Sequence, residues 1–271
     1  MRGEKRREVM AHWIVAHVPA WITGVVLIVV FPLAIVAIQA VLRRTVPALK
    51  KTEHNEVAGF LVAVIGVAYA VIAGFTIIVL WEHFTEAQNA TKVEALRATP
   101  LEQGSRVFGL ATQARLRREV IAYNQSVIDN WDTIKQGNAS PQVQANIDAM
   151  FTTIENLRPT TDAQRAFVHE AEARLLDLSN ERRHRIITAR EGKLPPLMWI
   201  AILIASAITI MFALLFGLES ARLHYVMVAG LAAIIGTNLF LVVELNYPFA
   251  GDISVEPTSY RTVVQELGSG E

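Results

Sequence analysis

Four long apolar runs dominate the chain, two on each side of a polar middle. They cover residues 18–42, 57–81, 196–218 and 223–247. Each run is longer than the roughly 20 residues that a helix needs to cross a hydrocarbon core about 30 Å thick. The pattern therefore predicts an all-α integral membrane protein. We expect four transmembrane helices in two pairs, with a helical cytoplasmic domain between the pairs.

The second apolar run continues into a polar stretch, residues 82–98, that is also compatible with a helix. No proline interrupts this stretch before Pro100. We predict one continuous helix of roughly 40 residues that extends some 25 Å beyond the bilayer, at about 1.5 Å per residue. Pro100 is expected to end it.

Apolar residues in the polar middle recur every three or four positions, which is typical of amphipathic helices. A first helix is predicted over residues 116–134, and a second after Ser140 and Pro141. A third opens at residues 161–164 with the Thr-x-x-Gln pattern of a capping box. No stretch alternates as a strand would, so the middle is predicted to be wholly helical.

These elements divide the sequence into four parts. Residues 1–81 hold the N-terminal segment with spans one and two, and residues 82–195 form the cytoplasmic helical domain. Residues 196–247 form the transmembrane hairpin of spans three and four, and residues 248–271 the cytoplasmic tail.

Composition removes several classes of protein. The chain has no cysteine, which excludes disulfides, thiolate catalysis and iron–sulfur clusters. Its 25 Lys and Arg residues balance 25 Asp and Glu residues, so bulk charge does not favour nucleic acid. The seven histidines show no metal-ligand spacing, and no nucleotide-binding or nucleophile motif is present. We therefore expect no enzyme, no cofactor, no bound metal and no nucleic-acid partner.

Lys and Arg residues near the span ends set the expected orientation. Twelve lie on the side that holds both termini and the polar middle, and five lie on the other side. The excess predicts a multi-pass protein whose N- and C-termini are both cytoplasmic.

Span two carries a regular stripe of small residues on one helix face. Its members, at spacings of four and three, are Gly59, Ala63, Gly66, Ala70 and Ala73, with Thr76 beside them. Small residues let helix backbones approach closely in lipid, so the stripe predicts a packing contact. A small, weakly polar stripe on an oligomer's repeated helix can also line a narrow pore. Both interpretations stay open, because one edge can pack while the other lines a path.

Span four carries polar residues within its apolar run. Asn238 is expected to hydrogen-bond a neighbouring helix, because an unpaired amide costs free energy in hydrocarbon. Glu244 is expected near the cytoplasmic end of the span, within reach of water. Before this span, Gly217 and Glu219 predict a tight reversal between spans three and four.

Two carboxylates, Asp252 and Glu256, follow span four. They could offer oxygen ligands to calcium, but two carboxylates do not fill the six or more positions that calcium takes. We expect a turn that folds the tail against the middle domain instead.

Cations are dense before span three, where Arg182, Arg183 and Arg185 precede Arg190. Such a run orients the chain and contacts lipid phosphates. Alternatively, Arg182, Arg183 and Arg185 form a vestibule that concentrates anions at a pore mouth.

Residues distributed over about 50–260 resemble the bestrophin-like family of bacterial four-span membrane proteins. The resemblance is carried, in order, by His54, Asn55, Gly59, Tyr69, Phe75, Trp81, Glu94, Ala95, Tyr123, Trp131, Arg182, Arg185, Pro248, Phe249 and Gly251. Bestrophins are pentameric, calcium-regulated anion channels whose second span lines the pore. The acidic cluster that binds calcium in bestrophins is reduced here to Asp252, so the resemblance does not carry calcium gating over.

The resemblance implies a homo-oligomer, with a pentamer favoured, in the inner membrane of a bacterium. Its partners would be the lipid bilayer and inorganic ions, conducted passively with anions slightly favoured. An alternative is a membrane-anchored helical sensor or scaffold that binds a cytoplasmic partner, in which packing seals the small-residue face. A transporter is disfavoured, because such proteins break their helices at mid-membrane and no proline interrupts span two or span four.

Overall fold

The computed structural model describes residues 15, 18–46, 55–190, 194–215 and 220–269, and every regular element in them is helical. The chain divides into two compact units. Unit 1 comprises residues 1–83, 192–247 and 251–253, and unit 2 comprises residues 84–191, 248–250 and 254–271.

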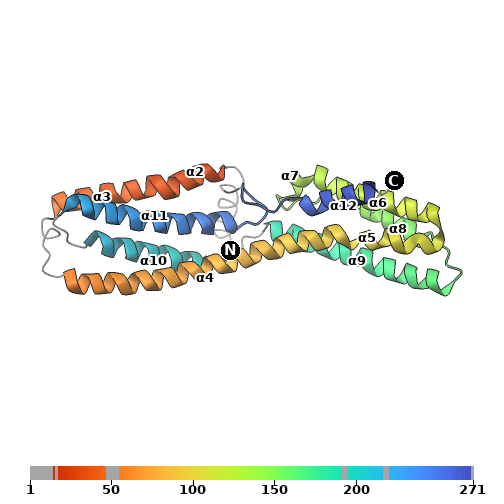
Figure 1. Cartoon of the computed structure of the whole chain (residues 1–271), viewed down its shortest axis with the longest axis horizontal. Coiled ribbons are helices and arrows are strands. Elements are labelled where there is room, and N and C mark those ends of the chain that lie inside the picture. Colours follow the sequence, from red (N-terminus) through yellow and green to blue (C-terminus); the bar gives the residue numbers. More distant parts are fainter. Residues whose placement is uncertain (1–14, 16–17, 47–54, 191–193, 216–219, 270–271) are drawn as a thin grey trace. The chain divides into compact units, whose positions relative to one another are not determined.

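The predicted fold class is confirmed. Figure 1 shows the helices, and four helical stretches are long and apolar enough to cross a membrane: Ala20–Thr45, Gly59–Phe108, Pro196–Leu215 and Ala221–Leu245. The long helix that follows from span two is also confirmed, since α4 runs from Asn55 to Arg97 over 43 residues. The reversal predicted at Gly217 and Glu219 lies outside the described residues.

Span one is not the uniform helix that its apolar run indicates. It consists of α2 (Ala20–Val25), the π-helical turn η1 (Val26–Val30) and α3 (Phe31–Thr45). Pro32 lies in the first turn of α3 and explains why a π-helical turn precedes that helix. A proline has no N–H to donate and its ring crowds the carbonyl four residues earlier, so the turn before it widens.

Helix α11 (Ala221–Leu245) is the central element of unit 1 and packs against α3, η1 and α10 (Pro196–Leu215). The contact with η1 depends on Gly236. A Cβ added there would lie 1.9 Å from the Leu27 carbonyl oxygen, so only glycine fits. The two backbones can therefore approach closely, as small residues allow between membrane helices.

Unit 2 holds the C-terminal part of α4 and the remaining helices, which are α5 (Thr99–Gly104), η3 (Ser105–Phe108), α6 (Leu110–Asp129), α7 (Trp131–Ile134), α8 (Pro141–Glu155), α9 (Asp162–Arg190) and α12 (Thr258–Gly268). Two predicted boundaries need correction. Pro100 lies in the first turn of α5, where a missing N–H costs nothing, and α4 ends earlier at Arg97. The helix predicted over 116–134 is broken at Asn130, whose backbone leaves the helical conformation.

The two predicted helix starts in unit 2 are confirmed by their caps. The Ser140 hydroxyl accepts a hydrogen bond from the Val143 N–H at 3.5 Å. At the start of α9, Thr161 Oγ1 accepts from the Gln164 N–H at 3.2 Å, and Gln164 Oε1 accepts from the Thr161 N–H at 3.3 Å. This reciprocal pair is a capping box.

The larger hydrophobic core of unit 2 joins α4, α5, α6, α8, α9 and α12. Its fully enclosed members include Leu116, Val120, Ile147, Leu175 and Leu178. The tail contributes through α12, which packs along α6. The predicted turn that folds the tail against the middle domain is therefore confirmed.

Candidate functional site

Helix α4 turns one face into unit 1. Tyr69, Ala73, Thr76 and Leu80, at intervals of three or four, are all buried, and Thr76 and Leu80 are wholly enclosed. Two members of the predicted pore-lining set, Ala73 and Thr76, thus lie on the face that packs within the subunit.

The other members of that set lie along the border of this packed face. Ala63 and Ala70 are exposed, and Gly59 and Gly66 are half-buried. A Cβ added at Gly66 would meet nothing within 4 Å, and the same holds for the nearby Gly74. We call Ala63, Gly66, Ala70 and Gly74 the small edge of α4. Among the described residues of one subunit, the small edge is therefore uncovered, in the sense that its alanines are exposed and a Cβ added at either glycine would meet open space.

Four hydroxyl side chains within the unit 1 helices are satisfied inside their own helix. Hydroxyl groups donate to the carbonyl four residues earlier, at 2.7 to 2.8 Å, from Thr76, Ser206, Thr209 and Thr237. A hydroxyl bonded in this way costs little in hydrocarbon, because it leaves no unpaired donor. These residues therefore do not by themselves indicate a water-filled path.

The interhelical hydrogen bond predicted for Asn238 is confirmed. Its Nδ2 donates to the Tyr69 hydroxyl at 3.4 Å, and this bond joins α11 to α4. Tyr69 also lies on the buried face of α4, so the bond joins the two helices on the face of α4 that turns inward.

The three arginines of the predicted vestibule have different surroundings. Arg183 is exposed and donates to Asn180 Oδ1 at 3.3 Å. Arg182 is buried, and donates to Gln144 Oε1 at 2.5 Å and to the Ser140 carbonyl oxygen at 3.4 Å. Burial lowers the pKa of Arg182 from its ordinary value. Of the three, Arg183 offers its charge most openly to solvent.

Arg185 forms an ion pair at the centre of unit 2. Its Nε donates to Glu94 Oε2 at 2.7 Å and its Nη2 donates to Glu94 Oε1 at 3.0 Å, with both side chains fully enclosed. Burial alone would lower the pKa of Arg185, but the Glu94 carboxylate raises it above its ordinary value. The pair connects α4 to α9, and Arg185 lies 6.0 Å from the Trp131 ring centroid.

Two buried tyrosines complete this polar centre. The Tyr123 hydroxyl donates to Glu94 Oε1 at 2.7 Å, and the Tyr260 ring lies 6.0 Å from Trp131. Burial, reinforced by the Glu94 charge, raises the pKa values of Tyr123 and Tyr260 well above their ordinary range. We call Glu94, Tyr123, Arg185 and Tyr260 the buried polar centre. Sequence reasoning did not pair these residues, although three of them carry the family resemblance.

The segment that begins at the end of α11 accepts hydrogen bonds at the start of α2 and just before α10. Asp252 Oδ2 accepts from the Ala20 N–H at 2.8 Å, at the start of α2, and Asn246 Oδ1 accepts from the Leu194 N–H at 2.9 Å, just before α10. The free N–H groups at a helix start favour such acceptors. Asp252 and Asn246 therefore have structural roles in holding the ends of spans one and three.

The expectation that water reaches Glu244 is wrong. Glu244 is 1% exposed, and both of its carboxylate oxygens are buried without a hydrogen-bond partner among the described residues. The cause is the turn after α11. Gly251 has a φ of +77° and lies against Val15 and Glu244, so the backbone closes over the carboxylate.

Among the described residues, no group of three or more His, Asp or Glu side chains could hold a metal ion.

Taken together, the four apolar helical stretches and the helical unit 2 define a four-span, all-α membrane protein. The chain matches the family model of the bestrophin-like domain over residues 29–260, so it belongs to the bestrophin-like family. Among curated protein sequences, no match was found.

Solved structures share this fold at low sequence identity. A bacterial bestrophin homolog from Klebsiella pneumoniae is 13% identical with a TM-score of 0.66, over 89% of this chain and 96% of that chain. A single-residue variant of that homolog is also 13% identical with a TM-score of 0.65, over 91% and 97%. A crystal structure described as a membrane protein is 14% identical with a TM-score of 0.63, over 89% and 99%.

Proposed function

We propose that the protein is a homo-oligomeric ion channel that conducts passively, with α4 from each subunit lining the path. The observation that carries this proposal is the small edge of α4, which is uncovered within one subunit of a bestrophin-like chain. Because Ala73 and Thr76 pack within the subunit, the proposed lining consists of Gly59, Ala63, Gly66 and Ala70, joined by Gly74.

Physical reasoning supports this arrangement over a lone subunit. An uncovered stripe of small residues offers lipid little apolar area, whereas the adjoining face of α4 carries the large exposed side chains Phe60, Val67 and Val71. When identical subunits surround an axis, small residues leave room between the helices and large ones fill contacts with neighbours. The small edge then bounds a narrow path.

The finer parts of the proposal rest on the family resemblance. A pentamer is favoured, and the membrane is a bacterial inner membrane. The proposal that both termini are cytoplasmic rests instead on the excess of Lys and Arg residues on that side of the spans. We propose that anions are conducted slightly better than cations. The exposed, positively charged Arg183 on α9 supports this preference. Arg185 forms an ion pair with Glu94 at 2.7 Å, so we do not propose that Arg185 attracts the conducted anions.

The test compares tryptophan substitutions on two faces of α4. Purified protein in planar bilayers should give unitary currents, and Gly66→Trp or Ala70→Trp should block or strongly reduce them. Ala68→Trp is the matched control, because Ala68 is an exposed small residue on nearly the opposite side of the helix. Normal currents from both Gly66→Trp and Ala70→Trp would exclude the small edge as the path.

A sensor or scaffold is the second candidate. It is favoured by an open groove of about 430 Å³ between α4 and α9, lined by residues that include Asn89, Val93, Asn180 and His184. The large apolar side chains Leu176 and Ile187 are also exposed on α9. Reconstituted protein that is folded and oligomeric yet gives no current under any condition would favour this candidate over the channel.

A further inference from the structure

An apolar pocket of about 350 Å³ lies between spans one, three and four in unit 1, and neither candidate function uses it. Among its described lining residues none is charged and none belongs to α4. They come from α2, η1 and the residues just before α2, from the start of α10 and from the end of α11. We call it the span-end pocket, lined by Val18, Ile22, Val26, Trp199, Val243 and Tyr247 among others.

The pocket arises from a change of side-chain size along one face of α11. At Gly236 the face is bare, and a Cβ there would lie 1.9 Å from the Leu27 carbonyl oxygen, so η1 lies directly against α11. One turn further along α11, the Phe240 ring lies 3.6 Å from a Cβ added at Gly24. Because a ring replaces the glycine there, α2 packs less closely on α11 than η1 does, and space opens beside Val243.

The pocket is elongated along span one. Val18, Ile22 and Val26 follow one another at intervals of four residues, so the lining continues along one side of the span. It reaches Leu27, roughly 10 Å beyond the start of α2 at about 1.5 Å per residue. That depth is much of one leaflet of a hydrocarbon core about 30 Å thick. The pocket therefore runs in the direction that an acyl chain takes in a bilayer.

Aromatic side chains mark one end of the pocket. Trp199 lies in the first turn of α10 and Tyr247 lies two residues after α11, so both are at span ends. Trp and Tyr favour the headgroup level of a membrane. Thr23 is the only other described lining residue with a polar side-chain group. The lining thus suits an amphiphile that is apolar along its length and polar at the end near Trp199 and Tyr247.

The surroundings of the pocket favour lipid over a second copy of the chain. Figure 1 shows α11 and α10 between span one and the unit 1 part of α4. In the proposed assembly α4 surrounds the axis, so span one faces outward. The large apolar side chains of Trp21, Val25 and Leu197, on the helices that line the pocket, are exposed. Lipid is therefore the expected neighbour of this face.

We propose that the span-end pocket binds one acyl chain of a membrane phospholipid. The chain enters beside Trp199 and Tyr247, where the headgroup stays in the interface, and runs inward along span one. A chain enclosed on several sides gains more dispersion contacts than a chain on an open helix surface, whereas an empty pocket leaves its lining without contact partners. By the predicted orientation, the phospholipid belongs to the cytoplasmic leaflet.

Native mass spectrometry of the detergent-purified oligomer counts the phospholipids that it retains. Detergent removes loosely held lipid, so we expect one phospholipid to remain for each parent subunit. Val243→Trp places an indole in the pocket and should lose that phospholipid. Val226→Trp is the matched control, because Val226 is 69% exposed on the same helix and is not among the described lining residues. A parent that retains no phospholipid, or equal counts in the two variants, would overturn the proposal.

A second pair of variants keeps the test decisive if Val243→Trp does not fold. Thr23→Trp fills the pocket from α2 and should also lose the phospholipid. Val25→Trp, at an exposed residue of α2 that is not among the described lining residues, should retain it. Retention in Thr23→Trp equal to that in Val25→Trp would count against the pocket as the lipid site.

A photoreactive lipid locates the bound chain in the unaltered protein. The probe is a phosphatidylglycerol with a diazirine near the end of one acyl chain, exchanged into the parent and irradiated after transfer to detergent. Peptide mapping should find the label within residues 18–27 and 243–247. Label confined to other segments would contradict the proposal. Because the measured quantity is bound lipid and not current, failure here leaves the channel proposal standing, and the reverse also holds.

Discussion

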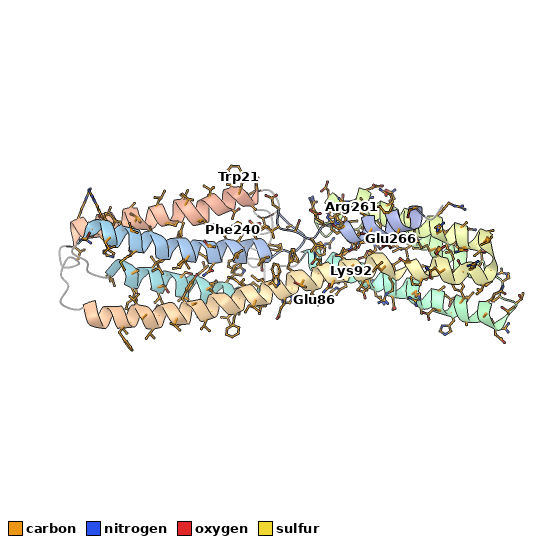
Figure 2. All side chains as sticks on the ribbon, in the orientation of Figure 1. Trp21, Glu86, Lys92, Phe240, Arg261 and Glu266 are labelled. Carbon is orange, nitrogen blue, oxygen red and sulfur yellow. The ribbon has the colours of Figure 1, made fainter. Side chains whose placement is uncertain are left out.

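Leu197 and Phe60, in unit 1, are 76% and 70% exposed, whereas Leu116 and Leu175, in unit 2, are completely buried. Figure 2 shows Trp21, another exposed apolar side chain of unit 1, projecting from α2. The interior of unit 1 holds polar side chains such as Gln39, Thr76 and His224 beside its buried apolar ones. Large apolar side chains therefore lie mostly outside in unit 1 and inside in unit 2.

The two units therefore differ in the forces that select which helix faces pack together. In unit 2, the hydrophobic effect drives the apolar stripe of each helix into a common core. The spacing of apolar residues along each helix therefore indicates which face packs against the other helices. In unit 1, lipid is as apolar as leucine, so burying leucine gains little. Small residues and hydrogen bonds then select the contacts, as Gly236 and Asn238 do.

Removing one partner of the buried ion pair should destabilise unit 2 most. Glu94→Leu leaves the Arg185 guanidinium enclosed without its carboxylate, and the expected loss is about 3–5 kcal/mol. Unfolding of the detergent-solubilised protein, followed by tryptophan fluorescence, measures it.

The double variant Glu94→Leu with Arg185→Met should recover most of that loss, because it leaves no unpaired charge. As a control, Arg174→Ala breaks the pair between the half-buried Arg174 and the exposed Glu170, and should cost under about 1 kcal/mol. If Glu94→Leu costs no more than this control, the pair does not hold the centre of unit 2.

Close backbone packing in unit 1 should be broken by one methyl group. Gly236→Ala places its Cβ 1.9 Å from the Leu27 carbonyl oxygen, and the overpacking should cost about 1–3 kcal/mol. Gly230→Ala is a matched control on the same helix, with nothing within 4 Å of its Cβ. It should be neutral or stabilising by about 0.4–1 kcal/mol. Equal melting temperatures for the two variants would contradict the proposed role of Gly236.

The hydrogen bond between α11 and α4 should make a smaller contribution. A double-mutant cycle of Asn238→Leu and Tyr69→Phe is expected to give a coupling free energy of about 0.6 kcal/mol, typical of such bonds between membrane helices. Unfolding of the four proteins measures the coupling. A value of zero would mean that van der Waals packing alone selects this face of α4.

The smallest effect is expected at an ion pair of unit 2 whose carboxylate, Asp132, is exposed. The hydrogen bond from Lys135, at 2.8 Å, and its charge lower the pKa of Asp132. The stabilisation is therefore present above the ordinary carboxyl pKa of about 4 and is lost as pH falls through the lowered value. Asp132→Asn should slightly lower the melting temperature at neutral pH and leave it unchanged in strong acid. A larger difference in acid than at neutral pH would show that this sign is wrong.

Part of the candidate site was predictable from sequence. The stripe from Gly59 to Ala73 was visible because its spacing is regular, and Asn238 was visible because an amide in hydrocarbon needs a partner. The sequence did not show which members of the stripe are buried and which are exposed. Ala73 and Ala70 are chemically equivalent, and only the position of Tyr69 on the packed face decides that one is buried and the other exposed.

Glu244 illustrates the same limit at the end of a span. Its position next to the membrane boundary indicated contact with water, but the glycine turn at Gly251 encloses it. Likewise, Arg182 and Arg185 belong to a cationic run whose sequence indicates a solvent-exposed face, although both side chains are buried in unit 2. Charge pattern along a helix does not reveal which partners the fold brings to it.

The sequence alone determined the four spans, the long helix after span two, and the helix starts at Ser140 and Thr161. Each depends on neighbours within one or two turns, so local hydrophobicity, spacing and capping are sufficient. Only the tertiary structure decided which face of α4 is covered, that Glu94 meets Arg185 across 91 positions, and that His224 faces Arg43 across 181. Those outcomes depend on contacts between distant segments, for which the chain carries no local signal.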